Sequence, residues 1–82
     1  MYYVYIIQSK KDSSFYIGFT GDLKKRINDH NLGSSRYTRA KIPWELVYIE
    51  SFKLKSEAIK RERFLKKQKN KDFYLRLIEN QG

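Results

Sequence analysis

The chain opens with a run of aromatic and β-branched residues. Residues 2–8 (YYVYIIQ) predict a strand, and their continuous apolar character indicates that both faces of this strand are covered. The polar residues 10–14 (KKDSS) predict a turn, and residues 15–20 (FYIGFT) predict a second strand, so we expect a hairpin. Gly18 inside the second strand marks a bulge or a close approach to the backbone.

The spacing of apolar residues changes to a helical period after the hairpin. Thr20 or Asp22 is expected to cap this helix, which should end near Asn31 with Gly33 as its stop signal. At roughly 100° per residue, several side chains share one arc of the helix. These are Leu23, Ile27 and His30, with Arg26 at the edge of the arc and on the same side as His30.

A basic polar loop, residues 34–43, is expected to lead into a third strand. Residues 44–52 (WELVYIESF) alternate in the manner of a strand, and we expect Trp44 to lie in the core. The two faces predicted by this alternation are Leu46 with Tyr48 and Val47 with Ile49. Because a helix precedes this strand, the pattern leaves its direction in the sheet open.

A second helix is expected to begin at a Ser56 cap and to run to about Gln68. Its apolar arc carries Ala58, Ile59 and Leu65. Glu62 lies in the middle of this arc, which is abnormal because burying an unpaired charge is costly. This carboxylate is therefore a candidate for a functional role.

A short final helix over residues 72–79 is expected after a cap at Asn70 or Asp72. We expect it to pack through Phe73, Tyr74 and Leu77. The element order is then ββαβα(α). Three strands covered by helices make a small α/β or α+β sandwich, and the length of 82 residues predicts one domain, residues 1–82.

The amino-acid composition excludes several kinds of functional site but says little about the fold. With no cysteine and one histidine, the chain cannot form a disulfide scaffold, a thiolate nucleophile or a multi-histidine metal site. The 18 Lys and Arg against 9 Asp and Glu give a net charge of +9, which points to a polyanion. Residues 60–71 concentrate this charge, with seven basic side chains and one acidic one. A solvated helix face is the alternative interpretation of this run.

The sequence carries no sign of a membrane partner. Its start, MYYVYIIQS, lacks the basic region and the long apolar core of a signal peptide. No stretch approaches the roughly 20 apolar residues of a membrane span, and no strongly amphipathic face is left over for a bilayer surface. We expect a soluble, cytoplasmic protein, and the sequence supports no inference of a protein partner.

Five side chains stand out as candidates for phosphodiester hydrolysis. Arginine can clamp a phosphate oxygen and offset developing charge, and one carboxylate can hold Mg²⁺, which keeps several waters. Tyrosine can orient or deprotonate a water molecule. The candidates are the paired-strand residues Tyr5 and Tyr16, the helix residues Arg26 and His30, and the inner-face residue Glu62.

Together these residues resemble the GIY-YIG nucleases, and in particular the small stand-alone bacterial members of that superfamily. The resemblance covers about residues 2–70, and residues 57–67 (EAIKRERFLKK) resemble the second helix of the stand-alone group. Its motif residues are Tyr3-Val4-Tyr5, Tyr16-Ile17-Gly18, Arg26 ten residues after Tyr16, His30 with Gly33, and Glu62. Two positions depart from the pattern. Tyr3 stands where the motif name has glycine, and Phe19 follows Gly18 where many catalytic members carry lysine.

The resemblance implies a three-stranded antiparallel sheet flanked by helices and a nuclease that uses one Mg²⁺ (or Mn²⁺). Tyr5 and Tyr16 match the tyrosines that position or activate the attacking water. Arg26 matches the arginine that contacts the scissile phosphate, and His30 matches a supporting polar group. Glu62 matches the only protein ligand of the metal ion, and water and substrate oxygens complete its octahedron.

Each of these side chains also has a purely structural interpretation. Tyr5 and Tyr16 are compatible with ordinary sheet aromatics, and His30 with a histidine near the carbonyls of a helix end. Arg26 is able to pair with Asp22 or Asp29, or to bridge to Glu62. These alternatives stay open at the level of sequence.

Two classes of function follow. The first is a Mg²⁺-dependent DNA endonuclease or a related structure-specific nuclease, and the alternative is a non-catalytic nucleic-acid-binding module that kept the fold. A carboxylate beside an anionic backbone favours the first; an RNA-directed or membrane-surface role rests on charge alone. The expected contacts are to the phosphate backbone. They come from Arg36, Arg39, Lys41, Lys60, Arg63, Lys66, Lys67 and Lys69.

Overall fold

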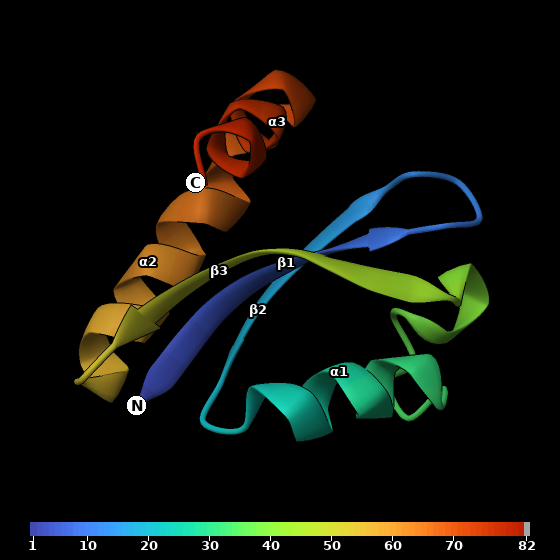
Figure 1. Cartoon of the computed structure of the whole chain (residues 1–82), viewed down its shortest axis with the longest axis horizontal. Helices are drawn as coiled ribbons and strands as arrows, with labels where there is room; N and C mark the ends of the chain where they lie inside the picture. Colours follow the sequence, from blue (N-terminus) through green and yellow to red (C-terminus); the bar gives the residue numbers. More distant parts are fainter. Residues whose placement is uncertain (82) are drawn as a thin grey trace.

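The computed structural model describes residues 1–81 as a central sheet with helices on both of its faces (Figure 1). The predicted element order is confirmed, with a short 3₁₀ helix added before the third strand. In chain order the elements are β1 (Tyr2–Ser9), β2 (Phe15–Thr20), α1 (Leu23–Asn31), the 3₁₀ helix η1 (Arg39–Lys41), β3 (Trp44–Phe52), α2 (Lys55–Gln68) and α3 (Lys71–Glu79).

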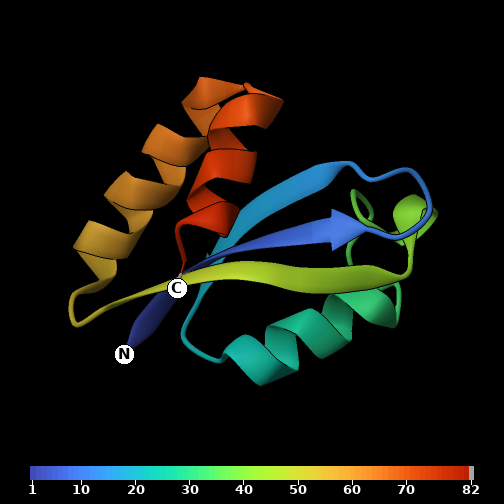
Figure 2. The ribbon, with the colours of Figure 1, turned by 45° about the horizontal axis from the view of Figure 1, so that its top comes forward.

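The sheet has the strand order β2-β1-β3, and β1 pairs antiparallel with both neighbours. The expected hairpin and the three-stranded antiparallel sheet are therefore confirmed, and the direction of the third strand is settled. Turning the molecule shows α2 and α3 together on one face of the sheet and α1 on the other (Figure 2). The fold is thus an α+β sandwich of three layers.

Strand β1 is buried on both faces, as its continuous apolar run predicts. Val4 and Ile6 belong to the cluster that packs under α2 and α3 with Ala58, Leu65 and Tyr74. Tyr5 and Ile7 belong to a smaller cluster with Trp44 under α1. Because successive side chains of a strand point to opposite faces, one strand supplies the centre of both cores.

The predicted alternation in β3 is wrong over its middle. The pairing with β1 shifts by one residue between Ile6 and Ile7, which is the mark of a β-bulge. Ile6 pairs with Tyr48 but Ile7 pairs with Leu46, so Val47 is the extra residue. Val47 and Tyr48 both pack against the core under α2 and α3. Leu46 and Ile49 instead share the α1 face, which strict alternation would not allow.

Two helix starts are those expected, and one is not. The Asp22 carboxylate accepts a hydrogen bond from the Lys25 N–H at 3.1 Å, and the Asn70 side chain caps α3 in the same way. Helix α2, however, begins at Lys55 after Leu54, and no side chain caps it. Ser56 already lies inside the first turn, so its expected role as the cap is wrong. A turn of helix without a side-chain cap leaves its first N–H groups to solvent.

The free edge of β3 is covered by a side chain from the C-terminal end of the described chain. The Gln81 amide accepts a hydrogen bond from the Ile49 N–H at 2.9 Å and donates one to the Val47 carbonyl at 3.0 Å. These are the two backbone groups that another strand would use. Within residues 1–81 no helix is long and apolar enough to cross a membrane.

Gly18 lies opposite Tyr5 in the hairpin, and the tyrosine ring lies over its backbone. A Cβ atom on Gly18 would stand 2.7 Å from the Cζ atom of Tyr5, well inside van der Waals contact. Tyr5 is 1 % exposed and its hydroxyl is hydrogen bonded to His30, so the ring has little room to move. Glycine at this position is therefore a requirement of packing.

We expect Gly18→Ala to lower the free energy of unfolding by about 1–3 kcal/mol, the usual range for overpacking a core. Urea or thermal unfolding measures this change. Gly21→Ala is the matched control, because a Cβ there meets Tyr2 at an ordinary 3.8 Å. Equal stability of the Gly18→Ala and Gly21→Ala variants would show that Tyr5 yields easily.

Candidate active site

A buried hydrogen-bonded chain joins Tyr5, His30 and Thr38. The Tyr5 hydroxyl lies 2.8 Å from His30 Nε2, and His30 Nδ1 lies 2.9 Å from Thr38 Oγ1. His30 and Thr38 are fully buried, and Tyr5 is nearly so. The chain therefore links β1 to the end of α1 and to the loop that follows it. Thr38 was not anticipated, because a threonine in a polar loop gives no sequence signal of burial.

Trp44 and Asn31 hold this loop in place. The Trp44 indole N–H donates to the Thr38 carbonyl at 2.8 Å, so Trp44 is a core residue as expected. The Asn31 side chain accepts a hydrogen bond from the Trp44 N–H and donates one to the Trp44 carbonyl. The end of α1, the loop and the start of β3 therefore form one hydrogen-bonded unit around His30.

Charged and polar groups from three elements converge on the Tyr5 hydroxyl. Burial raises the pKa of Tyr5 to about 12, and nearby Tyr16 and Glu62 act in the same direction. The guanidinium of Arg26 opposes this shift of the Tyr5 pKa. Side chains from β2, α1 and α2 therefore all act on the ionisation of the Tyr5 hydroxyl. The structure thus brings together the side chains that the sequence spaces 57 positions apart, from Tyr5 to Glu62.

His30 is held in its neutral form. Burial lowers its pKa below the ordinary value, the positive charge of Arg26 lowers it further, and Asp29 acts in the opposite direction. A neutral imidazole has one donor and one acceptor nitrogen. When protonated Tyr5 donates to Nε2, the Nδ1–H group donates to the Thr38 hydroxyl, so the two bonds are compatible with one tautomer.

Tyr16 stands on the edge strand β2, where side chains from both faces of the sheet meet. Its ring packs edge to face with His30, with centroids 5.1 Å apart, and with Trp44 at 6.4 Å. From the other side, the ammonium of Lys66 on α2 lies 5.8 Å from the centre of the same ring. The β2 edge is therefore the place where α1 and α2 come together around the site.

Glu62 points from the buried side of α2, between Ala58 and Leu65 in sequence, and its side chain is 15 % exposed. Its ion-pair partner is Lys66, one turn later, with 3.6 Å between Nζ and Oε2. A bridge between Glu62 and Arg26 is not found within residues 1–81. The sequence indicated the unusual carboxylate correctly, but the cation that balances it comes from the same helix.

Arg26 is half-buried, and among the described residues no carboxylate lies within ion-pair distance of it. Both suggested partners are engaged elsewhere. Asp22 caps the Lys25 N–H, and Asp29 pairs with the Lys25 ammonium at 3.0 Å. No carboxylate therefore neutralises the guanidinium, which leaves its charge available to an anion such as a phosphate.

The donor set is compatible with a hard divalent cation such as Mg²⁺ or Mn²⁺. Across residues 1–81, no three His, Asp or Glu side chains lie close enough together to hold an ion. Glu62 alone supplies one carboxylate, and a site with one protein ligand suits Mg²⁺, which retains its waters and shares substrate oxygens. A structural zinc site needs four protein ligands and does not fit.

The basic residues predicted to contact DNA fall into two groups on opposite faces of the sheet. Most of them are solvent-exposed, whereas Lys41 pairs with Asp12 at 3.2 Å. Arg61, on the same helix as the second group, makes a two-point contact with Glu50 at 2.8 and 2.9 Å. The exposed members are Arg36 and Arg39 in the loop after α1, and Lys60, Arg63, Lys66, Lys67 and Lys69 along and just after α2.

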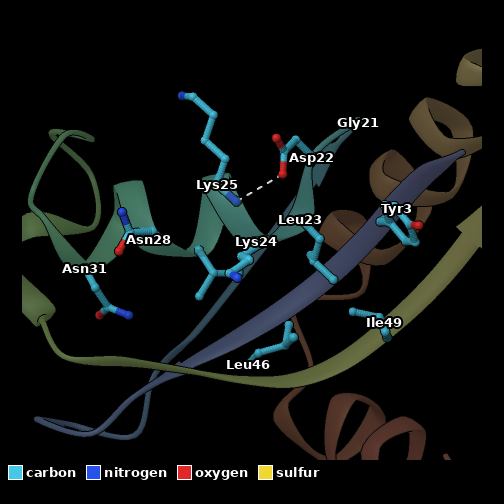
Figure 3. A pocket seen from close by; sticks show the side chains of 11 residues that line it. Tyr3, Gly21, Asp22, Leu23, Lys24, Lys25, Asn28, Asn31, Leu46 and Ile49 are labelled. Carbon is cyan, nitrogen blue, oxygen red and sulfur yellow. Dashed lines mark hydrogen bonds between the residues drawn. The ribbon is translucent and has the colours of Figure 1, made fainter.

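A groove with a volume of about 1210 Å³ lies between α1 and β3 (Figure 3). Tyr3, Leu23, Leu46 and Ile49 supply its apolar surface, and the bulge in β3 is what turns Leu46 and Ile49 toward it. None of the five candidate catalytic residues lines this groove. The groove lies near β3, which is the edge strand at the other end of the sheet from β2.

Comparison with known proteins confirms the family that the sequence motifs resemble. The sequence model of the GIY-YIG catalytic domain matches residues 1–75. A UPF0213 protein of Streptococcus pneumoniae is 40% identical over 80 residues, which are 96% of this chain and 80% of that protein. A UPF0213 protein of Clostridium perfringens is 50% identical over 68 residues, covering 82% of this chain and 72% of that protein.

A solved structure agrees with the fold. The solution NMR structure of a UPF0213 protein from Bacillus halodurans superimposes with a TM-score of 0.62 at 36% sequence identity. The match covers 100% of this chain and 87% of that one. With the family domain matched over most of its length and with relatives well above 30% identity, this chain belongs to the GIY-YIG family, in the group of UPF0213 proteins.

Proposed function

We propose that this chain is a Mg²⁺-dependent endonuclease that hydrolyses phosphodiester bonds of DNA in the cytoplasm. Membership of the GIY-YIG family indicates a nuclease acting on nucleic acid. The observation that carries the finer proposal is that Tyr5 and Tyr16 both contact His30, and that Lys66 links the Tyr16 ring to Glu62, while the charge of Arg26 acts on Tyr5. A carboxylate, a free guanidinium and two phenols around one point make a set suited to a phosphate and a water molecule.

Arg26 is proposed to bind the scissile phosphate. It has no carboxylate partner within residues 1–81, and from α1 its charge lowers the pKa of Tyr5. Negative charge grows on the phosphate oxygens during hydrolysis, and a preorganised guanidinium stabilises that charge more than it stabilises the ground state. Arg26 therefore acts mainly on the rate.

Tyr5 and His30 are proposed to handle the proton of the attacking water. With a pKa near 12, Tyr5 carries its own proton at neutral pH and needs an acceptor before it can take another. His30 Nε2 lies 2.8 Å away and is neutral, so it is able to receive that proton. Tyr16, with its ring packed on His30, is proposed to orient the water.

Glu62 is proposed to hold the metal ion. When bound, Mg²⁺ supplies positive charge that polarises the phosphate and favours departure of the alkoxide. The chain's own contribution is one carboxylate, kept largely out of water between the apolar residues of α2.

A specific observation favours the second candidate, a nucleic-acid-binding module without turnover. Phe19, where many catalytic members carry lysine, packs against the core under α2 and α3. Position 19 therefore offers no cation to the site. The same exposed basic residues serve both proposals, so only a cleavage assay separates them.

We expect the wild-type protein to cleave at least one of a panel of labelled linear, flap and branched DNAs with Mg²⁺ or Mn²⁺, and none with EDTA. Arg26→Ala should lower the single-turnover rate about 10²–10³-fold while weakening binding only modestly. The matched control is Lys25→Ala on the same helix, whose ammonium pairs with Asp29. Cleavage by Arg26→Ala within about threefold of wild type would remove Arg26 from the mechanism.

Metal binding by Glu62 predicts a separation of stability from function. Glu62→Gln keeps the shape of the side chain and loses only a weak i,i+4 ion pair. Without metal, its free energy of unfolding should therefore differ from that of the wild type by less than about 1 kcal/mol, and its melting temperature should change little. The gain in melting temperature on adding Mg²⁺ should disappear, together with cleavage. Glu57→Gln, an exposed acid on the same helix, should keep that gain. Persistence of the gain in Glu62→Gln would place the ion elsewhere.

DNA binding should be mainly electrostatic. If about four to eight phosphates are neutralised, raising salt from about 50 to 200 mM should weaken affinity by ~10²–10⁴. Fluorescence anisotropy with a labelled duplex measures this dependence. A flat response to salt would contradict the assignment of the exposed basic residues of α2 and the loop after α1 as phosphate contacts.

A further inference from the structure

Lys66 occupies a position in the site that surface contact with DNA does not explain. Its ammonium lies 3.6 Å from the Glu62 carboxylate and 5.8 Å from the centre of the Tyr16 ring, over its face. Carboxylates and aromatic faces both attract an ammonium group. Lys66 is therefore held against two of the five candidate catalytic side chains.

Helix α2 carries a second ion pair that differs in kind. Arg61 contacts Glu50 through two nitrogens, at 2.8 and 2.9 Å, and Glu50 also accepts a hydrogen bond from Tyr48. This planar, two-point pair is fixed in geometry and joins α2 to β3. The Lys66–Glu62 pair has one contact, longer and on a flexible four-carbon stem. The Arg61–Glu50 ion pair therefore fixes the helix to the sheet, whereas the Lys66–Glu62 ion pair dissociates more easily.

The charge of Glu62 explains why a cation is needed there. Its carboxylate is mostly shielded from water, and a shielded carboxylate without a counter-charge is unfavourable. Lys66 supplies that counter-charge in the metal-free protein. A divalent cation that binds the same carboxylate repels the ammonium, because like charges at such a distance interact strongly in a partly buried site.

We propose that the Lys66 ammonium pairs with the Glu62 carboxylate in the free protein, and that a divalent metal ion must displace it in order to bind. The proposal rests on the proposed function in one respect, that Glu62 is the metal ligand. It adds a regulatory property of the site: the side chain of Lys66 sets the metal affinity of the protein. Lysine suits this role better than arginine, since its single-point contact is released at small cost.

The test is the Mn²⁺ affinity of the free protein, measured by electron paramagnetic resonance without DNA. Lys66→Met should bind Mn²⁺ roughly five- to tenfold more tightly than wild type, because the competing charge is gone. Lys66→Arg, which keeps the charge, should show no gain. Lys55→Met removes the same unit of net charge from the first residue of α2, about two helical turns before Glu62, and should change affinity by less than about twofold.

The gain must also depend on Glu62. In the double variant Lys66→Met with Glu62→Gln, the tighter Mn²⁺ binding should be lost. Equal affinity of wild type and Lys66→Met, including no binding by either, would overturn the proposal, and so would a gain that survives Glu62→Gln. Binding by Lys66→Met with none detectable in wild type would support it.

A second measurement follows Lys66 itself. After reductive ¹³C-methylation of lysines, the Lys66 resonance should be displaced by the ring current of Tyr16 and should move when Mg²⁺ is added. In Glu62→Gln the Mg²⁺ response should vanish; a response that remains would count against displacement. These readouts use no substrate, so an inactive protein in which Lys66→Met still binds metal more tightly would refute the nuclease function and leave the role of Lys66 intact.

Discussion

The buried hydrogen bond between the Tyr5 hydroxyl and His30 Nε2 is the interaction on which the rest of the site depends. It forms only because Gly18 leaves room for the Tyr5 ring to lie across β2. Through His30 it reaches Thr38, and through the Thr38 carbonyl it reaches the Trp44 indole. A small core that offers few apolar contacts under α1 is thus locked by polar groups that all have partners.

The arrangement around this bond explains how a protein with a net charge of +9 organises an anion-binding site. The basic side chains of the surface attract a polyanion without distinguishing one position from another. Position is set by the few charges at the β2 edge: Arg26 from one face, and Glu62 with Lys66 from the other. Because these come from helices on opposite faces of the sheet, the site depends on the complete sandwich and not on any one element.

The spacing of apolar residues was sufficient to predict the helices and strands, because each of them packs its apolar face against the core. The run at 2–8 and the arcs of α1 and α2 identified their buried faces from spacing alone. The bulge at Val47 was not predictable, since nothing in WELVYIESF distinguishes a shifted register from simple alternation. Helix α2 starts without a side-chain cap, so a rule based on capping residues placed its cap at Ser56, two residues after the observed cap position Leu54.

The candidate site could be predicted as residue types but not as contacts. Glu62 was recognisable as a charge in an apolar arc, and Tyr5, Tyr16, Arg26 and His30 by their spacing. Its partners were not: Thr38 lies eight residues after His30 in a loop without periodicity, and Lys66 was indistinguishable from the other basic residues of its run. These contacts depend on tertiary packing, which spacing along the chain does not encode.

The Gln81 amide on the edge of β3 has a consequence for how this protein is handled. Its two hydrogen bonds fill the central donor and acceptor of a nine-residue strand that has no neighbour on that side within residues 1–81. An unfilled edge of this kind is a template for pairing with other chains. Truncation before Gln81, or an affinity tag that pulls the end of the chain away, would expose that template. Concentrated samples of such a preparation would then self-associate through the sheet, and their turbidity would reflect the position of the tag rather than any property of the active site.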